Sequence, residues 1–302
     1  MLTSPLRYPG GKQLLSHYIS CVLEAHMLSG CTFYEPYAGG ASVSLQLLDT
    51  GSISKAILVE RDILIYAFWH SVLNNADELC RRIGKMTVSL NTWKKLQPMR
   101  QIALLPKTES DILELGLAGL FFNRTNFSGI ISAGPIGGMK QKSDYKIDCR
   151  FNKERTIEQI MAISSHKKMI EVHHSDAIQF LKKSSRRLNS GGGFVYIDPP
   201  YYTQGKRLYR HYYEHSDHAL LADFITKQNY PWLISYDQHP SIQQLYKDNA
   251  IQAIYLDYRV KTSRQAEELL ISNMEIPPPF YEKAQIKGIS YNRSVGLNVE
   301  LF

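Results

Sequence analysis

Residues 32–60, TFYEPYAGGASVSLQLLDTGSISKAILVE, contain two short apolar segments separated by a glycine turn and an amphipathic stretch. The first apolar segment, Thr32–Glu35, is typical of a buried strand, and the spacing of apolar residues predicts a helix over Ala41–Leu48. A second strand is expected over Lys55–Val59. Because strand, turn, helix and strand follow in this order, the sequence predicts a parallel α/β sheet.

The same alternation returns in the second half of the chain. Strands are expected over Ile170–His174, Phe194–Asp198, Trp232–Tyr236 and Ile251–Leu256, with helices over Asp176–Leu188 and Ala219–Lys227. Between the two halves, residues 62–123 have a helical pattern and residues 128–142 are rich in glycine and lysine. We therefore expect an insertion over residues 71–165, which divides a core formed by residues 1–70 and 166–302.

Composition and charge narrow the class of protein. Of 302 residues, 44% are hydrophobic and 21% charged, as in ordinary globular proteins. The apolar stretches are far shorter than the roughly 18 residues of a membrane span, and the N-terminus lacks a signal peptide's apolar core, so we expect a cytoplasmic protein with no membrane partner. Four widely spaced cysteines argue against a zinc knuckle or a disulfide framework. The net charge of +7 favours a polyanionic partner.

The strongest chemical signal is Asp198-Pro199-Pro200-Tyr201, which directly follows an expected strand. In an open α/β sheet, ligands bind beyond the carboxyl ends of the strands. Asp198 and the Pro199 carbonyl can accept both hydrogens of an aromatic amine while Tyr201 stacks on its ring. The alternative is that the tetrapeptide only ends the strand, since Asp and Pro favour turns.

A second signal is the turn Glu35-Pro36-Tyr37-Ala38-Gly39-Gly40, followed by Glu60 at the end of the next strand. A glycine turn admits a ligand to a helix N-terminus, and an acid about 20 residues later can bind ribose hydroxyls, so an adenosine-type cofactor is expected. The full G-x-G-x-x-G pattern is missing, which disfavours a dinucleotide site. Asp176 also follows a strand, where a helix N-cap is an equal alternative.

Two other patterns lead to exclusions. Gly10-Gly11-Lys12 lacks the remaining residues of a phosphate-binding loop, so a nucleoside triphosphatase is not expected. His211, His215 and His218 match no metal-binding spacing, and we predict no metal site.

Five segments, in this order, resemble the Dam-like DNA adenine N6-methyltransferases of the α group. They are Arg7-Tyr8-Pro9-Gly10-Gly11-Lys12, the turn from Glu35 to Gly40, Glu60, Asn123-Arg124-Thr125-Asn126-Phe127-Ser128-Gly129, and Asp198-Pro199-Pro200-Tyr201. The resemblance covers nearly the whole chain. It implies a Rossmann-like methyltransferase core that uses S-adenosylmethionine, with the insertion as a mostly helical target-recognition domain.

The resemblance also assigns roles to single residues. It implies catalysis by Asp198, Pro199 and Tyr201, and cofactor binding by Tyr8, Lys12, Gly39, Glu60, Asp176 and Asp198. The sequence departs from the usual family pattern at Ala41, where glycine is common, and at Glu60, where Asp is common. Both departures are mild, because Ala is small and Glu keeps the carboxylate.

Double-stranded DNA is the partner that the resemblance implies. The predicted DNA contacts are Asn123, Arg124, Asn126, Lys140, Lys206 and Arg207, and Phe127 is a candidate intercalating or stacking ring. The basic and aromatic segment that includes Lys206 and Arg207 follows the catalytic turn. We expect it to be a mobile loop that DNA and cofactor together protect from proteolysis.

The expected reaction is direct transfer of a methyl group to the N6 amine of an adenine flipped out of the duplex, since the amine is otherwise paired and stacked. Cytosine C5 methylation needs a cysteine after proline, and none of the four cysteines has this neighbour. The alternatives are an RNA adenine N6-methyltransferase and a catalytically silent DNA-binding protein. A companion restriction endonuclease would place the protein in a restriction-modification system; without one it would be an orphan methylase.

Overall fold

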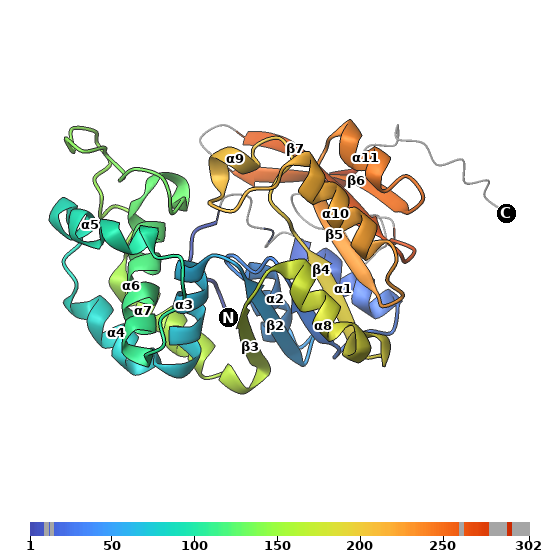
Figure 1. Cartoon of the computed structure of the whole chain (residues 1–302), viewed down its shortest axis with the longest axis horizontal. Coiled ribbons are helices and arrows are strands. Elements are labelled where there is room, and N and C mark those ends of the chain that lie inside the picture. The colour runs from blue at the N-terminus through green and yellow to red at the C-terminus, as the bar shows by residue number, and fades with distance from the viewer. Residues whose placement is uncertain (9–11, 13–14, 260–262, 278–288, 292–302) are drawn as a thin grey trace.

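A computed structural model describes residues 1–8, 12, 15–259, 263–277 and 289–291. Its strands form one sheet in the order β3-β2-β1-β4-β5-β7-β6-β8 (Figure 1). The strands are β1 (Thr32–Glu35), β2 (Lys55–Glu60), β3 (Ile170–His174), β4 (Gly193–Ile197), β5 (Trp232–Asp237), β6 (Ala250–Arg259), β7 (Ser263–Ser272) and β8 (Ile289–Tyr291). The strands from β3 to β5 are parallel, whereas β7 runs antiparallel between β5 and β6, and β8 pairs antiparallel with β6.

Helices cover both faces of the sheet. The α-helices are α1 (Leu15–Ala25), α2 (Ser42–Asp49), α3 (Ile63–Asn74), α4 (Ala76–Lys85), α5 (Leu90–Leu96), α6 (Glu109–Thr125), α7 (Lys153–Ser164), α8 (Ala177–Asn189), α9 (Gly205–Leu208), α10 (His215–Ile225) and α11 (Pro240–Leu245). Short 3₁₀ helices are η1 (Gln97–Gln101), η2 (Phe127–Gly129) and η3 (Lys167–Met169). No helix in these described parts of the chain is long and apolar enough to cross a membrane.

Successive residues of the central strands enter two different cores. Phe33 and Phe194 lie in the core beneath α1 and α2, whereas Tyr34 and Val195 lie in the core beneath α8 and α10. A strand that is buried on both faces must be apolar at consecutive positions, which explains the uninterrupted apolar runs in β2 and β4. The predicted α/β class with a Rossmann-like core is confirmed.

The helices of the insertion pack beside the sheet, at the left of Figure 1. Helix α3 lies against α6, and the contact is close because α6 presents Gly116 and Gly119 to it. A Cβ atom at Gly116 would lie 2.6 Å from the Ala67 carbonyl oxygen, and one at Gly119 would lie 2.5 Å from that of Leu64. The expected boundary at residues 70 and 71 falls inside α3, whose residues share one core with the sheet and with α6.

The order of the strands fixes the place where a ligand can bind. The parallel strands β1 and β4 are neighbours although they are far apart in sequence, and successive strands are added in opposite directions on their two sides. At such a switch point the loops after the two strands diverge and leave a crevice at their carboxyl ends. Glu35 ends β1 there, and Asp198 directly follows β4.

Candidate active site

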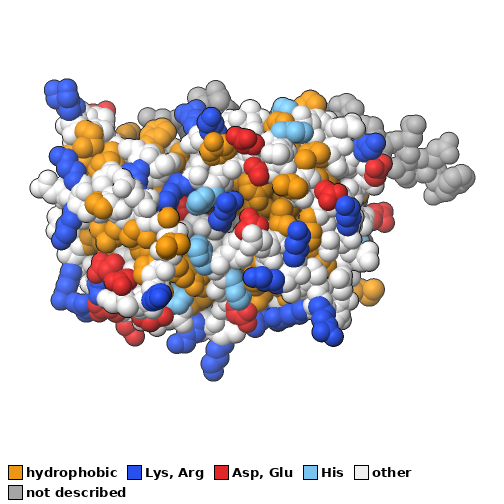
Figure 2. All heavy atoms as spheres, viewed as in Figure 1, with side chains coloured by type: hydrophobic (Ala, Val, Ile, Leu, Met, Phe, Trp, Pro, Cys, Tyr) orange, Lys and Arg blue, Asp and Glu red, His pale blue; other side chains and the backbone are white. Residues whose placement is uncertain are grey.

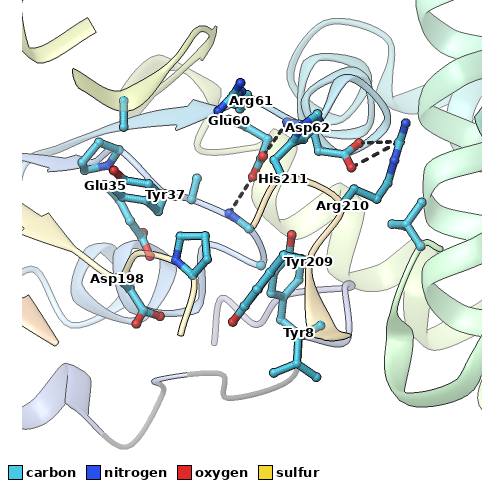
Figure 3. Close-up of a pocket in the computed structure, with 18 of the residues that line it drawn as sticks. Tyr8, Glu35, Tyr37, Glu60, Arg61, Asp62, Asp198, Tyr209, Arg210 and His211 are labelled. Carbon is cyan, nitrogen blue, oxygen red and sulfur yellow. Dashed lines mark hydrogen bonds and ion pairs between the residues drawn. The ribbon is translucent and has the colours of Figure 1, made fainter. Parts of the chain in front are cut away.

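A cavity opens at this switch point (Figure 3). The loops after β1, β2, β3 and β4 line it, together with segment 208–213 and residues 129–131 of the insertion. Every residue predicted to bind the cofactor lines this cavity: Tyr8, Lys12, Gly39, Glu60, Asp176 and Asp198. The turn Pro9–Gly11 of the first motif lies outside the described residues.

The glycine turn packs directly on an aromatic ring. Gly39 has a φ of +45°, and a Cβ there would lie 2.8 Å from the ring of Tyr8. The turn is held from both sides, since the Gly39 N–H donates to Glu60 Oε2 at 2.9 Å and its carbonyl accepts from Trp69 Nε1 at 2.8 Å. Only glycine combines this backbone conformation with such a close approach.

Glu60 joins the ends of β1 and β2. Besides the bond from Gly39, its Oε1 accepts the N–H of Asp62 at 2.7 Å. Burial and, to a smaller extent, the charge of Asp62 raise the pKa of Glu60 to about 7, against the lowering effect of these hydrogen bonds. The carboxylate therefore supports the turn, and it also lines the cavity.

Glu35 is a second buried acid of the cavity, and sequence reasoning gave it no role of its own. Both the hydroxyl and the backbone N–H of Ser44 in α2 donate to its Oε2. Burial raises its pKa to about 8, with a further raising effect from Asp198. Glu35 is therefore mainly neutral at pH 7, and it keeps a second negative charge away from Asp198.

Asp198 projects from the end of β4 into the cavity (Figure 3). Its Oδ1 accepts from the hydroxyl of Ser235 at 3.0 Å and lies 3.9 Å from Lys12 Nζ. Burial raises the pKa of Asp198 to about 6, although Lys12 lowers it. Among the described residues, none donates a hydrogen bond to Asp198 Oδ2 or to the Pro199 carbonyl, so both oxygens remain acceptors.

The chain after the two prolines is fixed from β5. Both carboxylate oxygens of Asp237 accept backbone N–H groups, from Tyr202 at 2.8 Å and from Thr203 at 3.0 Å. The phenol of Tyr201, one residue earlier, accepts from Lys12 Nζ at 3.2 Å. The predicted catalytic residues Asp198, Pro199 and Tyr201 thus lie on one anchored turn, although only Asp198 among them lines the cavity.

Segment 208–213 borders the cavity opposite Asp198. The ring centroid of Tyr209 lies 6.4 Å from that of Tyr8 and 6.3 Å from that of Tyr201. Arg210 Nη1 donates to both carboxylate oxygens of Asp62, each at 3.2 Å. Its Nη2 donates to the carbonyl of Arg100 at 2.9 Å. The ion pair is drawn in Figure 3. Arg210 thereby connects this segment to the N-cap residue of α3 and to the insertion.

Asp176 caps a helix and also lies in the lining of the cavity. Its Oδ1 caps α8 by accepting the N–H of Gln179 at 3.1 Å, and its Oδ2 lies 3.8 Å from Arg61. Asp176 and Arg61 also line the cavity. The helix cap therefore does not exclude a contact with the adenosine part of a ligand.

Asn123 and Asn126 require a correction. Both were expected to present amide groups to DNA, but both are fully buried. Asn123 bonds to the backbone of Arg7 and Gly129, and Asn126 accepts from Trp93 Nε1 and donates to two carbonyls of the following loop. Their bonds are satisfied inside the protein, so these amides shape the loop that carries the exposed ring of Phe127.

The basic residues predicted to bind DNA lie nearer the surface. Lys140, Lys206 and Arg207 are exposed, and Arg124 is half-buried. Burial and three neighbouring arginines lower the pKa of Arg124 to about 10; these neighbours are Arg7, Arg150 and Arg155. In the described part of the chain, none of these four arginines forms an ion pair with a carboxylate. We call Arg7, Arg124, Arg150 and Arg155 the arginine cluster.

Sequence reasoning missed three contributors to the site. Asp62 was not singled out, although an acid two residues after Glu60 is a visible signal at the same strand end. Arg210 received no role of its own, and nothing in the sequence shows that it pairs with Asp62. Glu268 received no role either, yet its Oε2 lies 2.5 Å from Lys12 Nζ.

Among the comparisons with known proteins, one shows a family. The sequence model of the D12 class N6 adenine-specific DNA methyltransferase family matches residues 8–262. No curated protein matches the chain. Among solved structures, a proposed RNA methyltransferase from Pyrococcus horikoshii is 12% identical, with a TM-score of 0.37 and coverage of 88% of this chain and 85% of that one. A ribosomal RNA methyltransferase from Streptomyces viridochromogenes is also 12% identical, with a TM-score of 0.30 and coverage of 84% of each chain.

Proposed function

The chain belongs to the D12 class N6 adenine-specific DNA methyltransferase family, and from this membership we propose that it methylates N6 of an adenine flipped out of duplex DNA, with S-adenosylmethionine as the methyl donor. The match confirms the resemblance seen in the sequence. One observation carries the proposal furthest: at the switch point, Asp198 Oδ2 and the Pro199 carbonyl are adjacent acceptors with no protein donor among the described residues.

Several lining residues suit the parts of the proposed cofactor. At Gly39 the backbone packs closely against Tyr8, where a Cβ would collide. Asp62, Asp176 and Asp198 lie in the lining with Lys12, Arg61 and Arg210, whereas the buried Glu35 is mainly neutral at pH 7. The carboxylate of Asp198 suits a sulfonium cation, and Glu60 would bind the ribose hydroxyls while Asp176 borders the adenine.

The protein's part in the reaction is to orient and activate the target amine. When bound, the cofactor would supply the methyl group, since breaking the bond between methyl and sulfonium sulfur leaves the electron pair on sulfur and releases a neutral thioether. Asp198 and the Pro199 carbonyl accept the two amine hydrogens, which concentrates the nitrogen lone pair, and Tyr201 stacks on the base. Positive charge develops on the amine during transfer, and the ionised Asp198 stabilises it and can accept the released proton.

DNA binding is supported by the positive charge of the chain outside the cavity. The chain carries +7 overall, and outside the cavity its Lys and Arg residues outnumber its Asp and Glu residues. Figure 2 shows Lys and Arg side chains at the upper left, where Figure 1 places the loop after α6. We assign the arginine cluster, Lys140, Lys206 and Arg207 to phosphate contacts, and Phe127 to stacking. A companion restriction endonuclease, a cytoplasmic location and residues 71–165 as the target-recognition domain stay predictions.

The test is methyl transfer from labelled S-adenosylmethionine to unmethylated genomic DNA and, separately, to total RNA. We expect N6-methyladenine in DNA, and Asp198→Ala should lower the rate at least ~100-fold because it removes an acceptor for the developing charge. Asp223→Ala, which changes an exposed aspartate on α10, is the matched control. Label in RNA alone would identify an RNA methyltransferase instead, and label in neither would contradict catalysis.

A further inference from the structure

Lys12 lies between two carboxylates, one close to its ammonium nitrogen and the other farther away. Its ammonium nitrogen is 2.5 Å from Glu268 Oε2 on β7 and 3.9 Å from Asp198 Oδ1 at the end of β4. Lys12 and Glu268 are each 2% exposed, so water screens their charges little. The closer carboxylate therefore determines where the ammonium group lies.

Glu268 also reaches the aromatic ring of the catalytic turn. The Tyr201 hydroxyl accepts from Lys12 Nζ at 3.2 Å and donates to Glu268 Oε1 at 3.4 Å. Lys12, Glu268 and Tyr201 thus each contact the other two. Because Glu268 uses one oxygen for the ammonium and the other for the phenol, it constrains both groups at once.

The competition for Lys12 bears on what Asp198 can do. Asp198 Oδ1 already accepts from Ser235, and its Oδ2 is the acceptor left for the target amine. With Glu268 neutral, Asp198 would still lie within ion-pair distance of Lys12, as the other carboxylate that the described residues place there. A buried ammonium moves toward its remaining counter-ion, because an unpaired buried charge is costly. Direct pairing would then compete with the amine for Asp198.

We propose that Glu268 is a positioning residue of the methyltransferase, which holds Lys12 away from Asp198 and fixes the Tyr201 phenol so that Asp198 stays free to accept the target amine. The proposal rests on the proposed function, since it assigns Glu268 to that same site. The resemblance implied a cofactor-binding role for Lys12, but it implied no role for Glu268 or for any other residue of β7.

The charges around Asp198 fix the direction of the expected pH effect. The described titratable groups that face Asp198 come from every neighbouring element: Lys12, Glu35, Tyr196, Asp237 and Glu268. Lys12 lowers the pKa of Asp198, and Glu268 and Asp237 raise it. Removing the Glu268 charge removes a like charge and brings Lys12 closer, so both effects lower the pKa of Asp198.

The direct test needs no substrate. The titration midpoint of Asp198 is measured from its side-chain ¹³C signal in the ligand-free protein, with Asp198→Asn to assign the signal. We expect Glu268→Gln to lower the midpoint and Lys12→Met to raise it, whereas Glu268→Gln in the Lys12→Met background should lower it much less. An equal decrease in both backgrounds would overturn the proposed action through Lys12, and so would an unchanged midpoint.

Activity gives the second readout. Glu268→Gln should reduce kcat on DNA ~10- to 100-fold, the usual range for a lost buried charge-assisted contact, with a smaller change in KM for S-adenosylmethionine. The acidic limb of its pH–rate profile should move to lower pH. If Glu268 had only a structural role, the Glu268→Gln variant would lose thermal stability while its acidic limb stayed at the wild-type pH. That result would contradict the proposal.

Two further results separate the possible failures. Wild-type protein that fails to methylate DNA while its Asp198 midpoint responds to Glu268→Gln would refute the proposed function but not the charge arrangement. Should Glu268→Gln fail to fold, Glu268→Asp retains a carboxylate one methylene farther from Lys12. Its Asp198 midpoint should then lie slightly below that of wild type, and an unchanged midpoint would refute the inference.

Discussion

Because Gly39 has no side chain, the glycine turn packs closely against the ring of Tyr8. Gly39→Ala should weaken binding of S-adenosylmethionine at least ~10-fold, because the new Cβ displaces the ring that lies 2.8 Å away. Gly30→Ala is the matched control, since Gly30 has a φ of +77° but nothing within 4 Å of its Cβ position. Both variants should lose about 1 kcal/mol of unfolding free energy to backbone strain. Calorimetry measures the affinity, and equal affinities in the two variants would contradict the role given to Tyr8.

Glu35 should make the protein less stable as the pH rises. Its pKa is about 8 in the folded chain against 4.5 for an ordinary glutamate, so between these values the folded state binds more protons than the unfolded state. Unfolding free energy therefore falls through this window. Glu35→Gln cannot titrate, and relative to wild type it should gain on the order of 1 to 3 kcal/mol between pH 5 and pH 8. Urea unfolding measures the gain. The exposed control Glu158→Gln should show none, and a pH-independent difference for Glu35→Gln would contradict the buried titration.

Single residues differed in how far the sequence could predict them. Gly39, Glu60 and Asp198 were predictable because each follows a strand, and parallel strands bring their carboxyl ends to one edge. Asn123 and Asn126 were not, because a polar side chain near an exposed loop can equally well face inward and bond to the backbone. The contact of Glu268 with Lys12 joins residues 256 positions apart, and no local pattern encodes it.

At the scale of elements, the contact between α3 and α6 depends on small residues. Gly119→Ala should destabilise the protein by about 1 to 3 kcal/mol, because its Cβ would overlap the Leu64 carbonyl in α3. Gly84→Ala in α4 makes the same change where nothing lies within 4 Å, so it should instead stabilise by about 0.5 to 1 kcal/mol through helix propensity. Chemical denaturation measures both, and changes of the same sign would contradict the close packing of α3 on α6.

The elements themselves were largely predictable, and for a physical reason. Strands β1, β2 and β4 are short apolar runs bounded by turn residues, and their predicted ends lie within one residue of those observed. The antiparallel placement of β7 between β5 and β6 was not predicted, because strand order depends on long-range pairing. The domain boundary expected between residues 70 and 71 falls inside α3. An apolar helix pattern does not reveal whether the helix packs on the sheet, on the helices of the insertion or on both.

For the whole molecule, the positive charge outside the cavity predicts how DNA binding depends on salt. Affinity should fall steeply with salt, and Arg150→Ala and Arg155→Ala should each reduce the slope of log K against log salt by about 1, as for one lost phosphate contact. Arg186→Ala is the control, because it changes the net charge by the same amount. Arg186 lies in the last turn of α8, at the opposite end from Asp176, so its loss should leave the slope unchanged. Fluorescence anisotropy over a salt series measures the slopes. Equal slopes for all variants would place the DNA elsewhere.

The shared helix α3 has a consequence for exchanging target specificity between relatives. Its residues from Ile63 to Asn74 are almost all buried, and they contact the sheet and α6 together. A chimaera that replaced residues 71–165 alone would join the first two turns of one parent's helix to the last turn of another and would pair foreign residues with Ala67 and Leu64. A recombinant that folds would therefore have to take α3 and the part of the sheet that it packs on from the same parent. New recognition would arise more readily by substitution in the exposed loops than by exchange of residues 71–165.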